Sequence, residues 1–378
     1  MNSEFSTETK IGILGGGQLG RMLIQAGIDL NLKFKVLDPD IHAPCAAISN
    51  FKEGKLTDYE TVIRFGSECD ILTIEIENVN TEALKELQKK GKKVFPQPEI
   101  VELIQDKRKQ KTFYKENHIP TADFILVENK ADANLYTSFL PAVNKLGKEG
   151  YDGRGVQVIK TAGDLRKAFD APGFLEKLVP FEKEIAVIVA RNELGEVKTF
   201  PAVEMVFHPE QNLVEYLYSP ATISAPVSEN ANSIARKIIE TLGMVGILAV
   251  EMFVTGQQIL VNEIAPRPHN SGHQTIEGNI TSQYEQHLRC ILGLPLGDTD
   301  IKIPSAMINL LGEPGFNGPA HYEGIKLVLA MEGANVHLYG KTITKPFRKM
   351  GHVTVVDHNL NRLVEKAKFV KHTLKVKS

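Results

Sequence analysis

The sequence predicts an α/β protein divided into several domains. Residues 10 to about 100 alternate short apolar strands with helices, the pattern of an open parallel sheet. Residues 246–264 have the pattern of two β-branched strands joined by a tight turn. The chain of 378 residues is long enough to bury the cores of two or three domains.

Each expected element follows from the apolar periodicity of its segment and from the turn residues that bound it. In the first hundred residues we expect strands at 10–14, 34–37 and 71–74, and helices at 19–30 and 81–91, the second capped by Thr81. A charged helix at 106–117, a strand at 141–145 and a glycine-dense stretch at 147–155 follow. Later strands are expected at 198–206, 246–254, 259–264 and 352–357, with helices at 228–242 and 281–292.

The composition excludes several classes of partner. Hydrophobic residues at 42% and charged residues at 24% are ordinary for a soluble globular protein. A net charge of −2 gives no electrostatic reason to expect nucleic acid or a membrane, and no apolar run approaches the ~18 residues of a spanning helix. Three scattered cysteines fit neither a disulfide framework nor a zinc site, so we expect a cytoplasmic protein. The polar residues 1–9 are expected to be a disordered extension.

Two glutamates stand at opposite ends of the predicted hairpin. If its loop is Gly256-Gln257-Gln258, Glu251 lies directly opposite Glu263. Like charges that face each other on a half-buried sheet repel, so a positive charge should lie between them. Mg²⁺, commonly bound by one or two carboxylates together with phosphate oxygens, is one candidate. The alternative is that each glutamate has its own lysine or arginine partner.

A glycine motif at 15–20 follows the first strand and opens the first helix, and Asp38 ends the next strand. This spacing satisfies the dinucleotide-binding fingerprint, whose acid binds a ribose. The physical requirement is only that a phosphate can approach a helix N-terminus, so any phosphorylated ligand would serve. Taken alone, the motif favours a nucleotide-dependent oxidoreductase, with a turn needed only for packing as the alternative.

The second glycine loop, 147–155, follows a strand that ends in Lys145. Its backbone N–H groups could fold over phosphate oxygens above the Lys145 charge, although it lacks the Gly-Lys-Ser/Thr ending of a Walker A loop. The next apolar strand, 174–179, could present its backbone to an adenine edge, and an acid that follows it could reach ribose hydroxyls. A surface hairpin and a solvated edge strand are the structural alternatives.

In order along the chain, these segments resemble the ATP-grasp ligases, and within them the family that carboxylates 5-aminoimidazole ribonucleotide in purine biosynthesis. The resemblance rests on GGQLGRM at 16–22, EIENV at 75–79, GYDGRG at 150–155, NEIAPRPHNSGH at 262–273 and RKMGH at 348–352. It implies an ATP-grasp fold: a Rossmann-like domain at 10–104, a small ATP-grasp subdomain at 105–195, a large ATP-grasp domain at 196–300 and a small C-terminal lobe at 301–378.

The reaction that the resemblance implies converts ATP, bicarbonate and the ribonucleotide into ADP, phosphate and an N-carboxylated ribonucleotide, through carboxyphosphate. Phosphoryl transfer depends on positioning and charge neutralisation more than on a protein nucleophile, which fits a sequence in which no nucleophilic triad stands out. The implied partners are therefore small molecules, with Mg²⁺ as cofactor and a homodimer as the assembly.

The resemblance also assigns roles to residues. It implies Glu251 and Glu263 as Mg²⁺ ligands. It implies that ATP is bound by Arg108, Lys145, Gly150, Tyr151, Asp152, Gly153, Arg154, Gly155, Val156, Glu176, Lys177, Leu178, Val179, Glu184, His208, Asn262 and Glu263. It places Gln18, Leu19 and Glu75 on the ribonucleotide, with Lys341 and Arg348 holding its 5′-phosphate. Arg267 is expected to stabilise carboxyphosphate, with His269 and Asn270 in the same cavity.

One of these assignments rests on the family pattern alone, and at one position the chain departs from that pattern. Glu75 is preferred to Glu77 by resemblance alone, since both would lie on one face of the same strand. Before Arg348 the chain has Lys345-Pro346-Phe347 where the family commonly has Arg-Pro-Gly, so Lys345 is not counted among the expected ligands.

Other functions remain open at this point. The nearest alternative is a formate-dependent phosphoribosylglycinamide formyltransferase or another ATP-grasp ligase; the formyltransferase tends to have an acid where this chain has Gln18. The oxidoreductase suggested by the first glycine motif is a second alternative. A nucleotide sensor that does not turn over is a third. His269 and His273 have a structural alternative too, in which they brace their loop.

Overall fold

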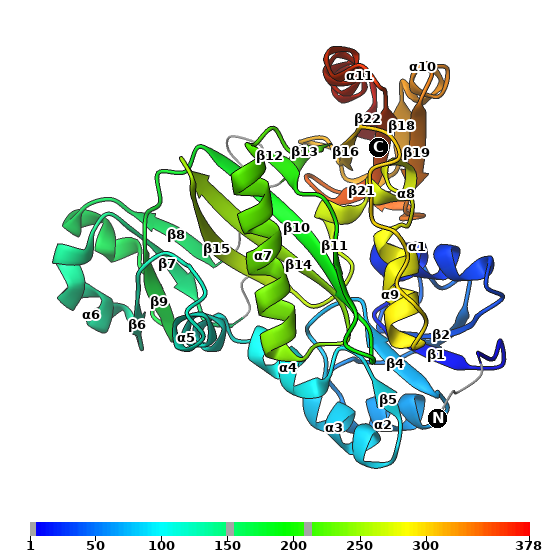
Figure 1. Cartoon of the computed structure of the whole chain (residues 1–378), viewed down its shortest axis with the longest axis horizontal. Coiled ribbons are helices and arrows are strands. Elements are labelled where there is room, and N and C mark those ends of the chain that lie inside the picture. Colours follow the sequence, from blue (N-terminus) through cyan, green and yellow to red (C-terminus); the bar gives the residue numbers. More distant parts are fainter. Residues whose placement is uncertain (1–4, 149–154, 208–213) are drawn as a thin grey trace.

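The computed structural model describes residues 5–148, 155–207 and 214–378. Figure 1 shows a first domain in blue, a small lobe in green-cyan, a large central sheet and a C-terminal lobe in orange and red. Residues 1–4, part of the expected extension, lie outside the described residues, whereas Glu8 is described and pairs with Lys33 at 2.5 Å. No helix within the described ranges is long and apolar enough to cross a membrane.

The first domain is built on a parallel sheet with strand order β3-β2-β1-β4-β5. Its strands are β1 Lys10–Leu14, β2 Lys33–Asp38, β3 Asn50–Glu53, β4 Ile71–Ile74 and β5 Lys93–Val94. Helix α1 (Gln18–Ile28) packs on one face, and helices α2 (Tyr59–Ser67) and α3 (Thr81–Lys89) pack on the other. Helix α4 (Pro98–Ile104) leads out of the domain.

The small lobe is an antiparallel sheet with strand order β6-β9-β7-β8. The strands are β6 Phe124–Val127, β7 Ala142–Leu146, β8 Val156–Ile159 and β9 Gly173–Lys177. Helix α5 (Lys107–Glu116) begins after Asp106, whose side chain accepts a hydrogen bond from the Arg108 N–H. Short helices α6 (Lys130–Ala133), η1 (Asn134–Phe139) and η2 (Ala162–Lys167) complete the lobe.

The large sheet runs in the order β15-β14-β10-β12-β13-β16-β21-β19, and β11 pairs with β10. The strands are β10 Lys183–Arg191, β11 Val197–Thr199, β12 Val203–Phe207, β13 Val214–Ser219, β14 Gly246–Thr255, β15 Gln258–Ala265, β16 Ser305–Leu311, β19 Ala334–Leu338 and β21 Lys349–Val356. Its first half is covered by α7 (Ala225–Leu242) and α9 (Gln283–Ile291).

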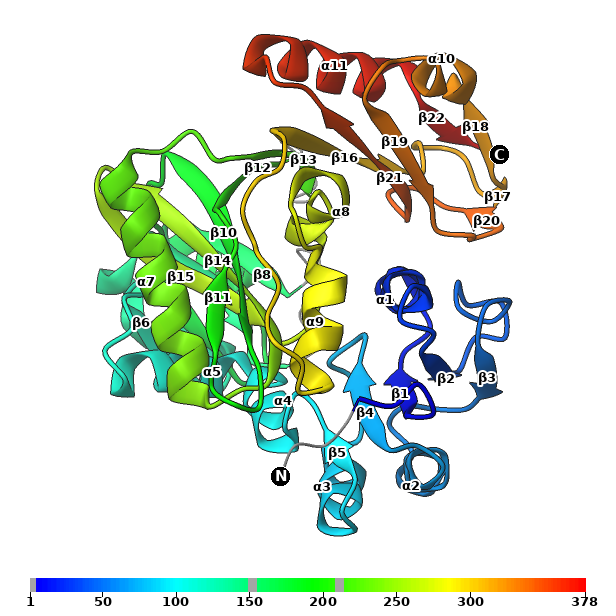
Figure 2. The same cartoon turned by 45° about the vertical axis from the view of Figure 1, so that its right-hand side comes forward.

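Both faces of β10 are buried because the two helices lie on opposite sides. Val187 and Val189 pack with α7, whereas Ile188 and Ala190 pack with α9 and with α1 of the first domain. Figure 2 shows α1 and α9 side by side where the first domain meets the central sheet. One apolar core therefore fixes the orientation of the two domains.

The C-terminal lobe shares the large sheet, because β13 pairs with β16 and β16 with β21. Helix α11 (Leu360–Thr373) covers these strands. The lobe also contains η3 Asn270–Gly272 and α8 Thr275–Gly278 at its border, and β17 Gly318–Pro319, β18 His321–Glu323, α10 Ile325–Leu329, β20 Ile343–Thr344 and β22 Lys375–Lys377.

Three expectations need correction. Helix α3 is capped by Asn80, which accepts from the Ala83 N–H at 2.9 Å, and not by Thr81. The strand expected at 198–206 is two strands, β11 and β12, because Pro201 lies between them and has no N–H to donate. Strand β10 belongs to the large sheet, although the small subdomain was expected to extend to residue 195.

Candidate active site

Glu251 and Glu263 are direct partners across β14 and β15, as expected. The reason differs from the predicted one. The turn contains only Gly256 and Gln257, since Thr255 pairs with Gln258, and this shifts the register by one residue. A bulge next to Glu251 shifts it back, so that Met252 faces Val261 and the two glutamates face each other.

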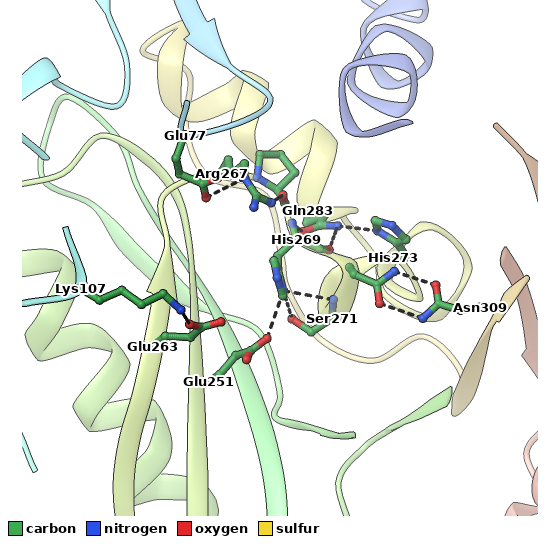
Figure 3. Close-up of polar contacts among 12 residues, drawn as sticks. Glu77, Lys107, Glu251, Glu263, Arg267, His269, Ser271, His273, Gln283 and Asn309 are labelled. Carbon is green, nitrogen blue, oxygen red and sulfur yellow. Dashed lines mark hydrogen bonds and ion pairs between the residues drawn. The ribbon is translucent and has the colours of Figure 1, made fainter. Parts of the chain in front are cut away.

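Each carboxylate also has a basic neighbour, as Figure 3 shows. The Lys107 ammonium pairs with Glu263 and holds the pKa of Glu263 at about 2, against the effect of burial. Nδ1 of His269 lies 3.6 Å from Oε1 of Glu251. Burial, together with the carboxylates of Glu263 and Glu184, raises the pKa of Glu251 well above its usual range. The charge of Glu263 is thus balanced by Lys107, whereas the ionised form of Glu251 is disfavoured.

The donor set fits a divalent cation with hard oxygen ligands. Glu184 adds a third carboxyl group, and burial with the Glu263 charge raises the pKa of Glu184 to about 7. Within the described parts of the chain, no group of three or more His, Cys, Asp or Glu side chains is arranged to hold a metal by itself. Two carboxylates that share a cation with phosphate oxygens are the arrangement that Mg²⁺ prefers, and they need no third protein ligand.

A second cluster surrounds Glu176 on β9. Its Oε2 lies 2.7 Å from the Lys145 ammonium, which also donates to Oδ1 of Asn262 at 2.8 Å. Oε1 of Glu176 pairs with Lys111, a residue that sequence reasoning did not select. The Glu176 carboxylate is therefore paired with two lysines, and Lys145 connects it to Asn262, the residue before Glu263.

The strand expected to contact adenine makes several contacts of its own. The Lys177 ammonium donates to the Phe139 carbonyl at 2.9 Å and lies 5.0 Å from the Phe139 ring centroid. The backbone N–H groups of Lys177 and Leu178 donate to the carbonyls of Asp123 and Pro141. These N–H groups are already satisfied inside the protein.

Helix α5 directs its cations to different places. Arg108, the expected phosphate contact, pairs with Glu128 at 2.5 Å. Lys107 and Lys111 are four residues apart, lie on one face of the helix and reach Glu263 and Glu176. The signal for these two residues is their i, i+4 spacing, in a helix that was expected only to be charged.

A third group forms around the first glycine motif. Oε1 of Glu75 accepts from the Leu19 N–H at 3.1 Å, and Oε1 of Gln18 accepts from the Lys341 ammonium at 3.0 Å. The structure therefore brings together four of the residues expected to bind the ribonucleotide. Burial raises the pKa of Glu75 to about 7, although the Arg267 guanidinium lowers it.

The hydrogen bonds of Asp38 argue against the oxidoreductase alternative. Oδ2 of Asp38 accepts from the Gly16 N–H at 2.7 Å, and its Oδ1 accepts from the Asp40 N–H at 2.8 Å. The carboxylate that would bind a ribose in the dinucleotide fingerprint is engaged by its own loops.

Glu75 and Glu77 do not share a strand, because β4 ends at Ile74. They have different partners as a result. Glu75 caps the start of α1, whereas Oε1 of Glu77 pairs with Nε of Arg267 at 2.8 Å.

The loop that follows β15 joins the carboxylate pair to the C-terminal lobe (Figure 3). Nδ1 of His269 lies 2.9 Å from the Ser271 hydroxyl, and Asn270 exchanges two amide hydrogen bonds with Asn309 at 2.9 and 3.0 Å. His273 is 1% exposed and contacts the Tyr284 hydroxyl at 2.9 Å. These contacts make His273 a brace of the loop.

Arg348 lies at the end of a turn in the C-terminal lobe. Its Nη1 donates to the Ile343 carbonyl at 2.7 Å, and it shares the 339–349 segment with Lys341. Phe347 has φ = +62°, a left-handed backbone conformation that glycine adopts easily. This explains why a glycine fits where this chain has phenylalanine.

Six of the expected ATP-site residues fall outside the described ranges: Gly150, Tyr151, Asp152, Gly153, Arg154 and His208. Gly155 and Val156 are described. The Gly155 carbonyl accepts from the Leu146 N–H at 2.9 Å, and Val156 pairs with Lys145.

Three family models match consecutive parts of the chain. They are the ribonucleotide synthetase preATP-grasp domain at residues 8–105, the ATP-grasp domain at 112–284 and the phosphoribosylaminoimidazole carboxylase C-terminal domain at 305–366. Along the chain, the three models match the first domain, the ATP-grasp part and the C-terminal lobe in turn.

Relatives and solved structures agree with these models. The N5-carboxyaminoimidazole ribonucleotide synthase of Synechococcus elongatus is 37% identical, over 91% of this chain and 89% of that protein. The N5-carboxyaminoimidazole ribonucleotide synthetase structure from Thermotoga maritima has a TM-score of 0.90 and 42% identity, covering 98% of this chain and 99% of that chain. A structure of the Aspergillus clavatus enzyme in complex with ADP and 5-aminoimidazole ribonucleotide has a TM-score of 0.87 and 32% identity, covering 96% and 100%.

The chain also matches longer fungal and plant proteins named phosphoribosylaminoimidazole carboxylase. It spans 69% of the length of the Ogataea methanolica protein and 65% of the Vigna aconitifolia protein.

Proposed function

The chain belongs to the N5-carboxyaminoimidazole ribonucleotide synthetase family of ATP-grasp enzymes, and on this premise we propose that it carboxylates 5-aminoimidazole ribonucleotide with bicarbonate and ATP in purine biosynthesis. The observation that supports this most directly is the facing pair Glu251 and Glu263, with the ammonium groups of Lys107 and Lys145 beside it. Carboxylates and ammonium groups in this arrangement suit a nucleotide phosphate and its cation.

In the proposed reaction a bicarbonate oxygen attacks the γ-phosphorus of ATP, and the bond to the ADP oxygen breaks. The resulting carboxyphosphate separates into CO₂ and phosphate, and the exocyclic amine of the ribonucleotide attacks CO₂ and loses a proton. The protein's contribution is to hold the reactants close together and to stabilise the developing negative charge. Lys145 and Lys107 supply such charge on the nucleotide side.

Mg²⁺ is proposed as the cofactor, held by Glu251 and Glu263. When bound, it would neutralise charge on the β- and γ-phosphates. Glu184 is proposed to contact the ATP ribose, and Asn262 to position Lys145. The residues from Glu176 to Val179 remain proposed neighbours of the adenine ring, and Arg108 remains a proposed contact to the nucleotide phosphates.

The ribonucleotide is proposed to bind where the first domain meets the C-terminal lobe. Gln18, Leu19 and Glu75 would contact it from the first domain, and Lys341 with Arg348 would bind its 5′-phosphate from the lobe. The Gln18–Lys341 hydrogen bond supports this placement, because it brings the two sets within reach of one ligand.

The loop from Arg267 to Asn270 is proposed to carry the reaction centre between the two binding regions. Arg267 would bind carboxyphosphate, with His269 and Asn270 nearby; the contact of His269 with Glu251 and of Arg267 with Glu77 supports this. From the family resemblance, residues 150–155 and His208 are also proposed to contact the nucleotide; all of them except Gly155 lie outside the described residues. The domain boundaries at 104 and 300 and a homodimeric assembly are further proposals.

A coupled assay of ADP formation tests the function. We expect ADP to form only when ATP, Mg²⁺, bicarbonate and 5-aminoimidazole ribonucleotide are all present. Formate with glycinamide ribonucleotide in place of the last two should give no ADP. If ADP formation does not depend on 5-aminoimidazole ribonucleotide, the proposal is wrong.

A further inference from the structure

Lys111 is a charged side chain in an apolar place. It is 2% exposed on helix α5, and its ammonium nitrogen lies 5.8–5.9 Å from the ring centroids of Tyr114, Phe124 and Phe174. Removing an ammonium group from water costs several kcal/mol unless it is well paired. A buried lysine therefore needs a partner of opposite charge, and its presence calls for a functional explanation.

The partner is Glu176, itself 3% exposed, and Thr121 accepts a second hydrogen bond from Lys111. The other carboxylate oxygen of Glu176 holds Lys145 at 2.7 Å. One carboxylate is thus shared by two ammonium groups, and the trio carries one net positive charge. Burial lowers the pKa of Lys111 to about 8, so it is still charged at neutral pH.

Packing alone does not require this charge. Three aromatic rings surround the side chain, and an unbranched apolar residue of the same length would fill the same space, while Glu176 would keep its ion pair with Lys145. Lys111, Lys145 and Lys107 line one small cavity of about 10 Å³ together with Asn262 and Glu263. The charge of Lys111 is therefore directed at the edge of the proposed nucleotide site.

We propose that Lys111 is a positioning residue for ATP: it occupies one oxygen of Glu176, so that Lys145 keeps its position and presents a net positive charge to the nucleotide phosphates. Without Lys111, the Glu176 carboxylate would cancel the charge of Lys145. Lys111 acts through Glu176 and does not itself contact the substrate. The inference rests on the proposed function, because it assumes that the nucleotide phosphates bind beside Lys145.

The experiment uses the full chain with Lys111→Met, Lys111→Arg and, as a matched control, Lys109→Met. Lys109 lies on the same helix but is 52% exposed and pairs with Glu102. We expect K111M to raise KM for ATP and Kd for Mg·ADP about tenfold, with KM for the ribonucleotide unchanged. K111R should stay within about threefold of the wild type because it keeps the charge, and K109M should match the wild type.

A double variant separates this role from a structural one. K111M together with Glu176→Gln restores one net positive charge, so we expect it to bind Mg·ADP more tightly than K111M alone. If K111M binds Mg·ADP as the wild type does, or if the double variant is weaker than K111M, Lys111 is a packing residue and the inference is wrong. If K111M does not fold, the same decision follows from Lys111→Gln alone and with Glu176→Gln.

The two proposals fail in different ways. Wild-type protein that forms no ADP in response to 5-aminoimidazole ribonucleotide overturns the proposed function. The Mg·ADP titrations, which need no turnover, decide the role of Lys111 in either case.

Discussion

Replacing Glu251 with glutamine tests the central electrostatic feature of the site. The change keeps the shape of the side chain and removes one of two facing charges. At about 5 Å, two like charges repel by about 3 kcal/mol at an effective dielectric constant of 20 and by less than about 1 kcal/mol in water. The Glu263 side chain is 41% exposed and paired with Lys107, so we expect a gain near the lower end, about 1 kcal/mol.

This gain depends on pH in a defined direction. The folded protein raises the pKa of Glu251, so the protonated group favours folding below the unfolded pKa of 4.5, and that stability is lost as pH rises through the folded pKa. The glutamine variant does not lose it. We therefore expect E251Q and the wild type to melt together near pH 5, and the variant to melt about 1 °C higher near pH 9.

Thermal melts of the ligand-free proteins at both pH values are the assay, with Glu240→Gln, an exposed change on α7, as the control. A second pair of melts adds Mg²⁺ and ADP. The wild type should be stabilised and E251Q much less so, and ligase activity should fall at least about a hundredfold. The reasoning is refuted if E251Q melts below the wild type near pH 9, or if Mg²⁺ and ADP stabilise both proteins equally.

Three further predictions follow from other features. Lys107→Met removes the ammonium paired with Glu263, so the ADP assay should show kcat reduced at least about tenfold; unchanged kcat would place Lys107 outside the site. Burial lowers the pKa of His287 to about 3, so its neutral form adds stability that is lost as pH falls below about 6.5. In urea unfolding, His287→Gln should therefore weaken the pH dependence of the unfolding free energy between pH 6 and 4 by up to about 1.4 kcal/mol per pH unit. An unchanged pH dependence would contradict this prediction. The Phe347→Gly variant should have a higher melting temperature than the Phe347→Ala variant, because this position has a positive φ. At most other positions the glycine variant would be the less stable of the two. The opposite order of melting temperatures would show that the backbone is not strained here.

The first domain was predictable because its parallel strands are apolar on both faces. Strands β1 and β4 lie at the expected residues 10–14 and 71–74, where burial on two sides produces an uninterrupted apolar run. Local rules were weaker where two residues competed. Asn80 and Thr81 can each cap a helix, and only the backbone geometry decides between them.

The carboxylate pair was predicted correctly from a wrong turn. A three-residue loop without a bulge and a two-residue loop with a bulge give the same partner for Glu251, and the sequence does not distinguish them. The difference matters for the residue at the bulge. Asn262 lies between the paired positions 261 and 263, and its side chain holds Lys145.

The lysines of α5 were missed for a different reason. A helix with the sequence KRKQKTFYKE has polar residues on most of its surface, and such a pattern usually means solvation. Arg108 was selected by resemblance, but the face of α5 that points to the site carries Lys107 and Lys111. Which face is buried depends on β9 and β15, strands that are roughly 60 and 150 residues further along the chain.

The charges of the site give an independent reason to expect a divalent cation. Among the described side chains, the carboxylates of Glu176, Glu184, Glu251 and Glu263 interact with the ammonium groups of Lys107, Lys111, Lys145 and Lys349. These charges are nearly balanced without a ligand, and a triphosphate at the proposed site adds several negative charges. Lysines alone therefore cannot balance the complex. Burial and the neighbouring carboxylates raise the pKa values of Glu184 and Glu251, so these two groups hold their protons more tightly than free carboxyl groups do. Binding of Mg²⁺ with the nucleotide should consequently release protons from these carboxyl groups, and calorimetric titration in two buffers of different ionisation enthalpy should show it. Equal apparent enthalpies in the two buffers would mean that the carboxylates are already ionised in the free protein.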